Sequence, residues 1–135
     1  MATVNATISL ASDITDSNIN VSNTSSLFEA GSTTGLTTMT SVTKVLSSTS
    51  QVDLITTGSV STTHAYVYIN NPSTDATEFF KITIGAADGG EVEEIGRLYG
   101  GDWMFIPWSG GSGKDIEFTA SDTTETTLEY TCFYE

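Results

Sequence analysis

Apolar and polar residues alternate with a period of two through most of residues 64–135, and this pattern is typical of half-buried β-strands. In residues 79–84, for example, Phe80, Ile82 and Ile84 fall on the same side of the strand. The pattern predicts strands at residues 64–69, 79–84, 91–98, 103–106, 115–120 and 126–134. We expect the last of these strands to lie centrally in its sheet.

Residues 1–63 differ in composition, because they are rich in Ser and Thr and contain a single aromatic residue, Phe28. Weaker signals predict strands at residues 3–10, 40–46 and 51–56, and loops or a mobile arm at residues 11–25 and 31–39. Ser26–Glu29 has the spacing of a capping box and predicts one helical turn. A segment so poor in large apolar side chains does not form a core alone. We therefore expect a single domain overall, with an N-terminal strand or arm at residues 1–25 and a β-sandwich at residues 26–135.

The number of strands and the spacing of the turns define the expected fold class. A chain of 135 residues is long enough for one hydrophobic core. About eight to ten short strands without a long helix are typical of sandwiches and barrels. We predict an all-β fold, an antiparallel β-sandwich of jelly-roll-like topology with a Ser/Thr-rich N-terminal arm.

The charge balance excludes several classes of partner. Seventeen acidic residues against four basic ones give a formal net charge of −13. Such a surface repels phosphate backbones and anionic lipid, so we expect neither a nucleic-acid nor a membrane partner. No apolar run reaches the length of a membrane-spanning helix, and residues 1–4 lack the features of a signal peptide. We therefore expect synthesis in the cytoplasm.

The sequence contains no complete catalytic motif. Gly110–Lys114 is similar to a phosphate-binding loop, but Trp108 and Asp115 stand where that motif requires Gly and Ser or Thr. His64 is the only histidine, and no Gly-x-Ser-x-Gly motif accompanies it. Cys132 lies in an alternating run, and we interpret it as a small buried apolar residue. We predict that the protein is not an enzyme and has no catalytic residues.

Metal binding is weakly indicated at most. One His and one Cys cannot build the usual tetrahedral zinc site within one chain. Asp13–Asp16 and Asp88–Glu91 are turns with oxygen ligands, yet neither has the ligand spacing of an EF-hand. We predict no cofactor and no metal site, and leave bound calcium at these turns as the open alternative.

Residues 94–111 gather side chains that are rare in the rest of the chain, including the only arginine and both tryptophans. Residues 103–106 are apolar at every position, which predicts a strand buried on both faces, and Pro107 should end that strand or lie on a sheet edge. Trp103 and Trp108 are five residues apart and point to opposite faces of an unbroken strand, so at least one leaves the core.

Exposed Trp, Tyr and Arg side chains are frequent hot spots of protein interfaces. Simple core packing and a platform for stacking carbohydrate are the alternative interpretations of this block. The candidate partner-binding residues are Arg97, Tyr99, Trp103 and Trp108 in the block, and Val4 and Ile8 in the N-terminal strand.

The second part of the chain contains a series of short patterns that carry a family resemblance: His64–Asn71, Phe80–Ile84, Ile95–Leu98, Gly101–Asp102, Phe105–Trp108, Asp115–Ile116 and Leu128–Tyr130. Together they resemble small virion structural proteins of tailed bacteriophages, particularly marine and cyanobacterial ones. The resemblance covers approximately residues 60–135 and involves structural residues without a catalytic motif.

The resemblance implies a non-enzymatic virion structural protein. The role that the resemblance implies is that of a capsid decoration, or cement, protein, which binds the outer surface of the major capsid protein shell and stabilises it. The implied partners are the major capsid protein and further copies of the chain in a homotrimer, located on the outer surface of the phage particle. The N-terminal arm would add a strand to a neighbour's sheet. The alternative is a tail or fibre protein that binds a host-surface glycan through its tryptophans, and a small esterase or glycosidase is a third hypothesis.

Overall fold

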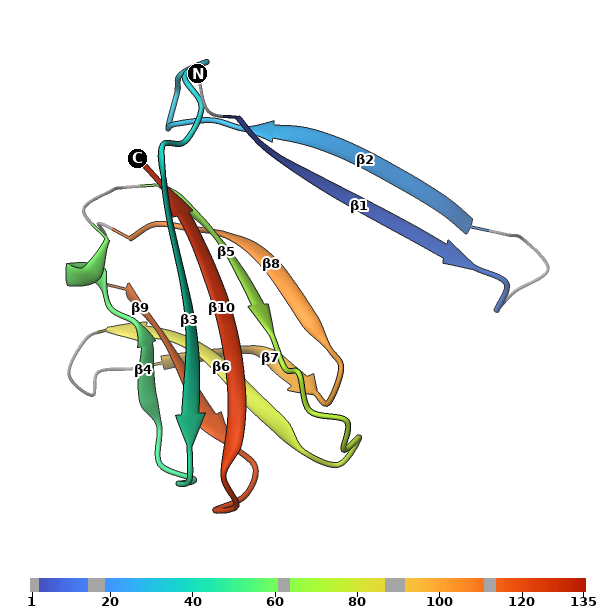
Figure 1. Ribbon diagram of the computed structural model, residues 1–135, viewed down its shortest axis with the longest axis vertical. Coiled ribbons are helices and arrows are strands. Elements are labelled where there is room, and N and C mark those ends of the chain that lie inside the picture. The colour runs from blue at the N-terminus through green and yellow to red at the C-terminus, as the bar shows by residue number, and fades with distance from the viewer. Residues whose placement is uncertain (1–2, 15–18, 61–63, 87–91, 111–113) are drawn as a thin grey trace. The chain divides into compact units, whose positions relative to one another are not determined.

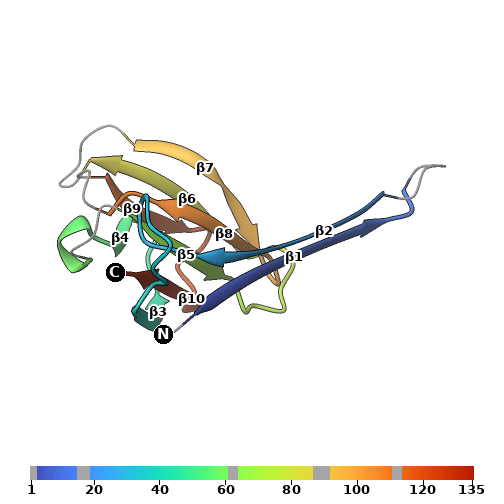
Figure 2. The same cartoon turned by 90° about the horizontal axis from the view of Figure 1, so that it is seen from above.

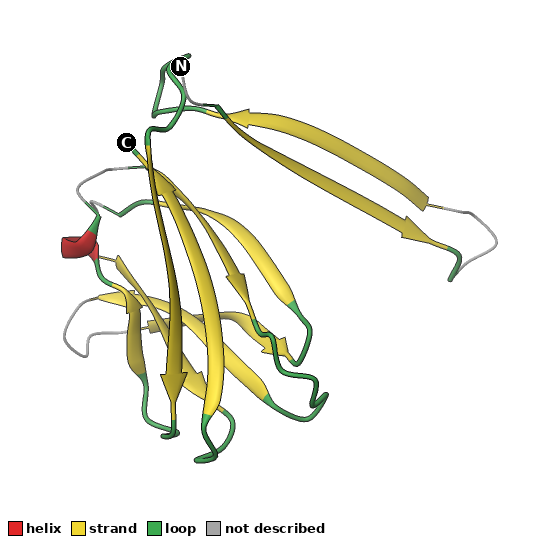
Figure 3. Cartoon of the chain, viewed as in Figure 1, coloured by secondary structure: helices red, strands yellow, loops and turns green. Residues whose placement is uncertain are grey.

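The structure, a computed structural model, describes residues 3–14, 19–60, 64–86, 92–110 and 114–135 (Figure 1). Strands dominate these residues, and a single 3₁₀ turn, Thr57–Ser59, is found among them (Figure 3). The strands are β1 Val4–Ser12, β2 Ile19–Leu27, β3 Thr38–Leu46, β4 Val52–Ile55, β5 Ala65–Asn70, β6 Phe79–Ala86, β7 Val92–Tyr99, β8 Trp103–Trp108, β9 Lys114–Ala120 and β10 Thr126–Tyr134. All their ladders are antiparallel, so the predicted fold class is confirmed.

The chain divides into two compact units, Met1–Thr37 and Thr38–Glu135. The first unit contains the hairpin of β1 and β2, and the second contains all the other strands. The predicted division at residue 25 falls inside β2.

The second unit consists of two four-stranded sheets with the strand orders β3-β10-β5-β8 and β4-β9-β6-β7. Figure 2 shows them as separate layers, with β6 and β7 in one and β3 and β10 in the other. Only the β6–β7 connection stays within a sheet; every other connection crosses to the opposite sheet. This is the strand arrangement of an eight-stranded jelly roll. The terminal strand β10 is central in its sheet, as predicted.

The core of the second unit lies between the two sheets, where alternate residues of both point inward. Phe80 and Phe118 meet edge to face there, with their ring centroids 5.6 Å apart. Cys132 is buried in this core, and burial raises the pKa of its thiol to about 11, so it behaves as the small apolar residue that was predicted. The buried apolar residues of this core are Leu54, Ile55, Val60, Ala65, Val67, Ile69, Phe80, Ile82, Leu98, Trp108, Ile116, Phe118, Ala120, Leu128 and Cys132.

The structure corrects two local predictions in the first unit. The helical turn predicted at Ser26–Glu29 is wrong, since β2 continues to Leu27 and Phe28 forms an isolated bridge with Gly35. The Ser26 hydroxyl donates a hydrogen bond across the hairpin to the Asn5 side chain, 2.8 Å away, instead of capping a helix. The loop prediction for residues 11–25 is also wrong for residues 19–25, which belong to strand β2. Most side chains of this strand are polar, so the sequence lacks the apolar alternation of a strand there.

The prediction that residues 103–106 form a strand buried on both faces is wrong. Strand β8 is the edge strand of its sheet, and Trp103 at its start is 51% exposed. The second unit has two layers, so each of its strands has one face toward the core and its alternate side chains on the outer face of the sheet. Pro107 lies in this edge strand, as its missing N–H group predicted.

Candidate interaction surface

The outer face of the β3-β10-β5-β8 sheet carries a cluster of aromatic side chains. In β5, Ala65, Val67 and Ile69 are fully buried, so their neighbours Tyr66 and Tyr68 lie on the outer face of the sheet. Residues directly opposite in an antiparallel register share a face. The rings that this register brings together on the outer face, which we call the aromatic face, are Tyr66, Tyr68, Trp103, Phe105 and Phe133.

The rings of the aromatic face are arranged in contact with one another. Tyr66 and Phe105 stack with their centroids 5.7 Å apart and their planes 5° from parallel. Tyr68 and Trp103 lie 6.1 Å apart at 37°, and the His64 ring meets Tyr66 edge to face at 4.8 Å. These separations are those of favourable aromatic pairs. Four of the five rings therefore form two contacting pairs, and Trp103 is the exposed ring among them.

Polar groups adjoin the rings on the neighbouring strands of the same face. Asn70 lies opposite Trp103 in the register and donates a hydrogen bond to the Glu129 carboxylate, 3.1 Å away. Farther along the sheet, the hydroxyls of Ser41 and Thr131 are 2.7 Å apart. Among the described residues of this outer face, Glu129 is the only charged one. The face therefore passes from aromatic at β5 and β8 to hydroxyl-rich at β10 and β3.

Trp103 and Trp108, both predicted to contact a partner, point to opposite sides of β8. Trp108 is 4% exposed, packs in the core, and donates its indole N–H to the Lys114 carbonyl, 2.8 Å away. It closes the core from inside and presents no surface to a partner. Trp103, in contrast, belongs to the aromatic face, so the expectation that one tryptophan leaves the core is confirmed.

Arg97 and Tyr99 lie on β7, on the outer face of the opposite sheet. Leu98 between them is buried, which turns both of its neighbours outward. The Arg97 guanidinium lies 5.0 Å from the centre of the Phe79 ring, and the Tyr99 ring is 5.2 Å from that of Phe79. Glu94 accepts a hydrogen bond from Arg97 at 3.2 Å and raises the pKa of the guanidinium. Arg97 is therefore held within its own sheet, apart from Trp103.

Val4 and Ile8 lie on β1 in the first unit. Val4 is half-buried and Ile8 is 38% exposed. The predicted partner-binding residues thus fall on three different surfaces and the core.

Four members of the aromatic face were not among the predicted site residues: Tyr66, Tyr68, Phe105 and Phe133. A signal for Tyr66 and Tyr68 exists in the sequence, because they alternate with the small and branched residues Ala65, Val67 and Ile69. Two apolar faces on one strand mean that one of them is directed outward or toward a second layer. Which face is outward depends on the strand order, and local periodicity does not encode that order.

The outer face of the β4-β9-β6-β7 sheet is polar and includes a buried carboxyl group, Glu117, which is 4% exposed. Gln51 and Thr83 donate hydrogen bonds to the Glu117 carboxylate. Burial raises the pKa of Glu117, and the neighbouring charges of Asp53 and Asp115 raise it further. This site holds a carboxyl that keeps its proton more tightly than an exposed one does.

The described part of the chain contains no group of three or more His, Cys, Asp or Glu side chains that is able to hold a metal ion. The possible calcium turn Asp88–Glu91 lies outside the described residues, as do Asp16 of the other turn and residues 111–113 of the glycine-rich segment. Within the same described ranges, no helix has the length and apolar character needed to span a membrane.

Comparison with known proteins gives a distant structural similarity. No protein-family profile matches the chain, and no curated protein matches it. A similar solved structure is that of the Yersinia pseudotuberculosis-derived mitogen, with 13% sequence identity and a TM-score of 0.46. The similarity covers 73% of this chain and 86% of the mitogen chain.

Proposed function

We propose that the protein is a non-enzymatic structural component of a phage particle, a capsid decoration protein that attaches to the outer surface of the major capsid protein shell. The observation that carries this proposal is the aromatic face, on which five rings lie together in a chain whose net charge is −13. Residues 60–135, which resemble virion structural proteins, include all five of these rings.

The chemistry of the aromatic face favours a protein partner. Contiguous apolar patches on a protein surface commonly mark contact sites, and Trp, Tyr and Phe are enriched at the centres of interfaces. Trp103 is 51% exposed and Met39, opposite Phe133 in the register, is 63% exposed, so both have area left to bury. A sheet face with such a cluster of rings suits attachment to another folded surface.

The charge of the chain favours the outside of a particle over its interior. A surface with seventeen acidic and four basic residues is repelled by packaged DNA. Several weakly attached copies on a regular shell gain avidity when they are linked to one another. Binding through the aromatic face would then reinforce the shell without any chemical step.

The test is binding to shells assembled from the major capsid protein of the phage that encodes this chain. We expect the purified protein to sediment with the shells, and electron microscopy to place its density on their outer surface. Trp103→Ala should weaken this binding by about tenfold or more, the usual loss for an aromatic anchor. Tyr99→Ala is the matched control, since Tyr99 is 41% exposed on the outer face of the opposite sheet.

Two outcomes would overturn the decoration role. One is the absence of binding to shells by a protein whose circular dichroism shows it folded. The other is density on the tail of purified particles with none on the head.

A second candidate function, binding of a host-surface glycan by a tail or fibre component, is favoured by the surroundings of Trp103. Its half-exposed ring lies beside Tyr68, and the Asn70 amide and Glu129 carboxylate follow in the same row of the sheet. Ligand sites combine such apolar rings with a few polar groups that fix orientation. Glycan-array or host-cell binding by the isolated protein that is lost in Trp103→Ala would support this function and contradict the decoration role.

A further inference from the structure

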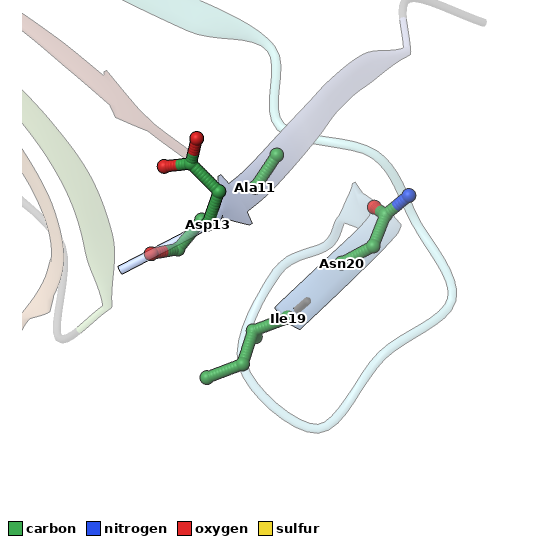
Figure 4. Close-up of a pocket in the computed structure, with 5 residues that line it drawn as sticks. Ala11, Asp13, Ile19 and Asn20 are labelled. Carbon is green, nitrogen blue, oxygen red and sulfur yellow. The ribbon is translucent and has the colours of Figure 1, made fainter. Parts of the chain in front are cut away.

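The β1–β2 hairpin has one apolar and one polar face. Its register pairs Leu10 with Val21 and Ser12 with Ile19, and side chains directly opposite share a face. Ile19 and Asn20 are adjacent on β2 and line a hollow at the end of β1 and the start of β2. Figure 4 shows that their side chains point in opposite directions. The apolar face of the hairpin consists of seven apolar residues, Val4, Ala6, Ile8 and Leu10 of β1 and Ile19, Val21 and Leu27 of β2, together with the small uncharged residues Ser12, Asn23 and Ser25.

The polar face of the hairpin is made of short hydroxyl and amide side chains that bond to one another. The Thr7 and Thr24 hydroxyls are 2.9 Å apart across the strands, and the Ser26 hydroxyl donates to the Asn5 side chain at 2.8 Å. Hydroxyl and amide groups are also well solvated by water. This face is therefore suited to solvent and leaves the apolar face as the one that lacks a cover.

The apolar face is open over much of its length. Leu10 is 57% exposed, Ile19 55%, Val21 49% and Ile8 38%. A two-stranded hairpin is marginally stable in water unless further strands or another layer cover its apolar side. Nine paired positions in each strand give a ribbon about 30 Å long. A ribbon of this length with an open apolar face needs a covering layer.

The distribution of charge indicates what that layer is. Strands β1 and β2 contain no charged residue, and only three of the seventeen acidic residues, Asp13, Asp16 and Glu29, precede Thr38. The other fourteen acidic residues and all four basic ones belong to the second unit. Two copies of this chain repel one another strongly through their second units and hardly at all through their hairpins. A charged foreign partner would find no complementary charge on the hairpin strands.

We propose that the apolar face of the hairpin is a self-association surface that packs on the same face of a second copy of the chain. An uncharged face of small branched side chains is complementary to itself, as a two-fold contact requires. Two such ribbons packed face to face form a two-layer sandwich about 10 Å thick, and the apolar residues of both copies fill its interior. The contact goes beyond attachment to a capsid and stands whether or not the protein decorates one.

The test is the mass of the purified full chain by sedimentation equilibrium, without any virion component. We expect twice the 14.3 kDa mass of the chain at micromolar concentration and stronger association at high salt, which screens the acidic second units. Leu10→Lys should weaken association by about 30-fold or more, because it removes an apolar anchor and buries a charge. The change also lowers the net negative charge, so general repulsion cannot explain the loss.

Ser9→Lys is the matched control, because Ser9 is the adjacent residue on the polar face. It adds the same charge and should leave association unchanged. A chain that stays monomeric at high concentration and high salt would overturn the proposal, as would equal effects of the two lysines. Association that survives Leu10→Lys and is lost in Trp103→Ala would assign self-contact to the aromatic face and likewise overturn it.

A second measurement does not depend on the folding of a lysine variant. Leu10→Cys places a thiol on the apolar face, whereas the native Cys132 is 1% exposed and its thiol pKa is raised by burial. Mild oxidation should join Leu10→Cys chains into disulfide-linked dimers and leave Ser9→Cys chains mostly unlinked. Equal cross-linking of both variants would contradict the assignment of the face.

Discussion

The two sheets of the sandwich share one core and have opposite chemistry on their outer faces. On the β4-β9-β6-β7 sheet, the polar groups find partners inside the chain: the Asp115 carboxylate accepts the Thr57 N–H at 2.7 Å, and Arg97 pairs with Glu94. On the β3-β10-β5-β8 sheet, the outward rings contact one another, and Trp103 remains half exposed. The first outer face satisfies most of its polar groups within the chain, apart from the Thr119 hydroxyl, and Tyr99 is its exposed ring. The second outer face gathers five rings, among which Trp103 is half exposed and has area that a partner can bury.

This difference distinguishes the side chains that stabilise the fold from those that are available to contact a partner. Both sheets contribute alternate apolar residues to the core, and these residues account for the burial of apolar area between the sheets. The aromatic rings lie outside that layer. If they serve contact with a partner, their removal should cost the isolated protein much less stability than removal of an inward ring.

The largest effect on stability is expected from truncation of an inward phenylalanine. Phe118→Ala removes a ring that is 1% exposed and packed against Phe80, so we expect a loss of about 3–5 kcal/mol in the free energy of unfolding. Phe105→Ala makes the same change at a half-buried ring of the aromatic face and should cost less, about 1–2.5 kcal/mol, from the smaller buried area and the stacked pair together. Urea denaturation followed by tryptophan fluorescence measures both. Equal losses in the free energy of unfolding would mean that the aromatic face stabilises the fold as much as the core does, and would remove the reason to assign it a partner.

The turn between β7 and β8 is the next most sensitive position, because it leads the chain from one outer edge to the other. A Cβ added at Gly100 would lie 2.3 Å from the Asp75 carbonyl oxygen and 2.9 Å from that of Ser73, both of them backbone atoms. Gly100→Ala should therefore destabilise the protein by about 1–3 kcal/mol, as forced overpacking does. Gly96→Ala on β7 meets no atom within 4 Å and is the control, with a change within about 0.5 kcal/mol. Comparable melting temperatures for the two variants would contradict this account of the turn.

The inner layer and the strands of the second unit could be predicted from the sequence. Alternation identifies the inward residues of β6 and β10 without knowledge of their neighbours, and burial on one side enforces that pattern. The edge position of Pro107 and the apolar role of Cys132 also follow from local chemistry, since one lacks an N–H donor and the other lies in an alternating run. These features depend on the residue and its immediate neighbours.

The candidate surface could be predicted only in part, because it depends on strand order. Arg97, Tyr99 and Trp103 lie within seven residues of one another, yet the turn after Tyr99 places them on opposite sheets. The apolar run of β8 did not show that one face of the strand is turned outward, because a doubly buried strand and a strand with an outward aromatic row have the same composition. Strand β2 was not predicted for a related reason. Its residues are mostly polar and pair with β1 across the hairpin, so the alternation of apolar and polar residues that identifies a strand is weak.

The smallest effect is expected on the polar outer face, from the buried carboxyl of Glu117. Its pKa is raised, first by burial and then by the charges of Asp53 and Asp115, so the folded chain holds this proton more tightly than the unfolded chain. As the pH rises from the ordinary range of a glutamate through the folded pKa, the unfolded state ionises first and the contribution of this group to stability falls. Glu117→Gln removes that titration and can still accept hydrogen bonds from Gln51 and Thr83.

The stability of Glu117→Gln relative to the native chain should therefore increase as the pH rises above the ordinary range of a glutamate, because the native chain then loses the contribution of its retained proton. Glu125→Gln, at an exposed position between β9 and β10, changes the net charge equally and controls for general repulsion. Urea midpoints of the three proteins at several pH values measure the effect. If the two glutamine variants respond to pH in the same way, the raised pKa of Glu117 makes no measurable contribution to stability. The contrast between the two outer faces then depends on the five rings of the aromatic face.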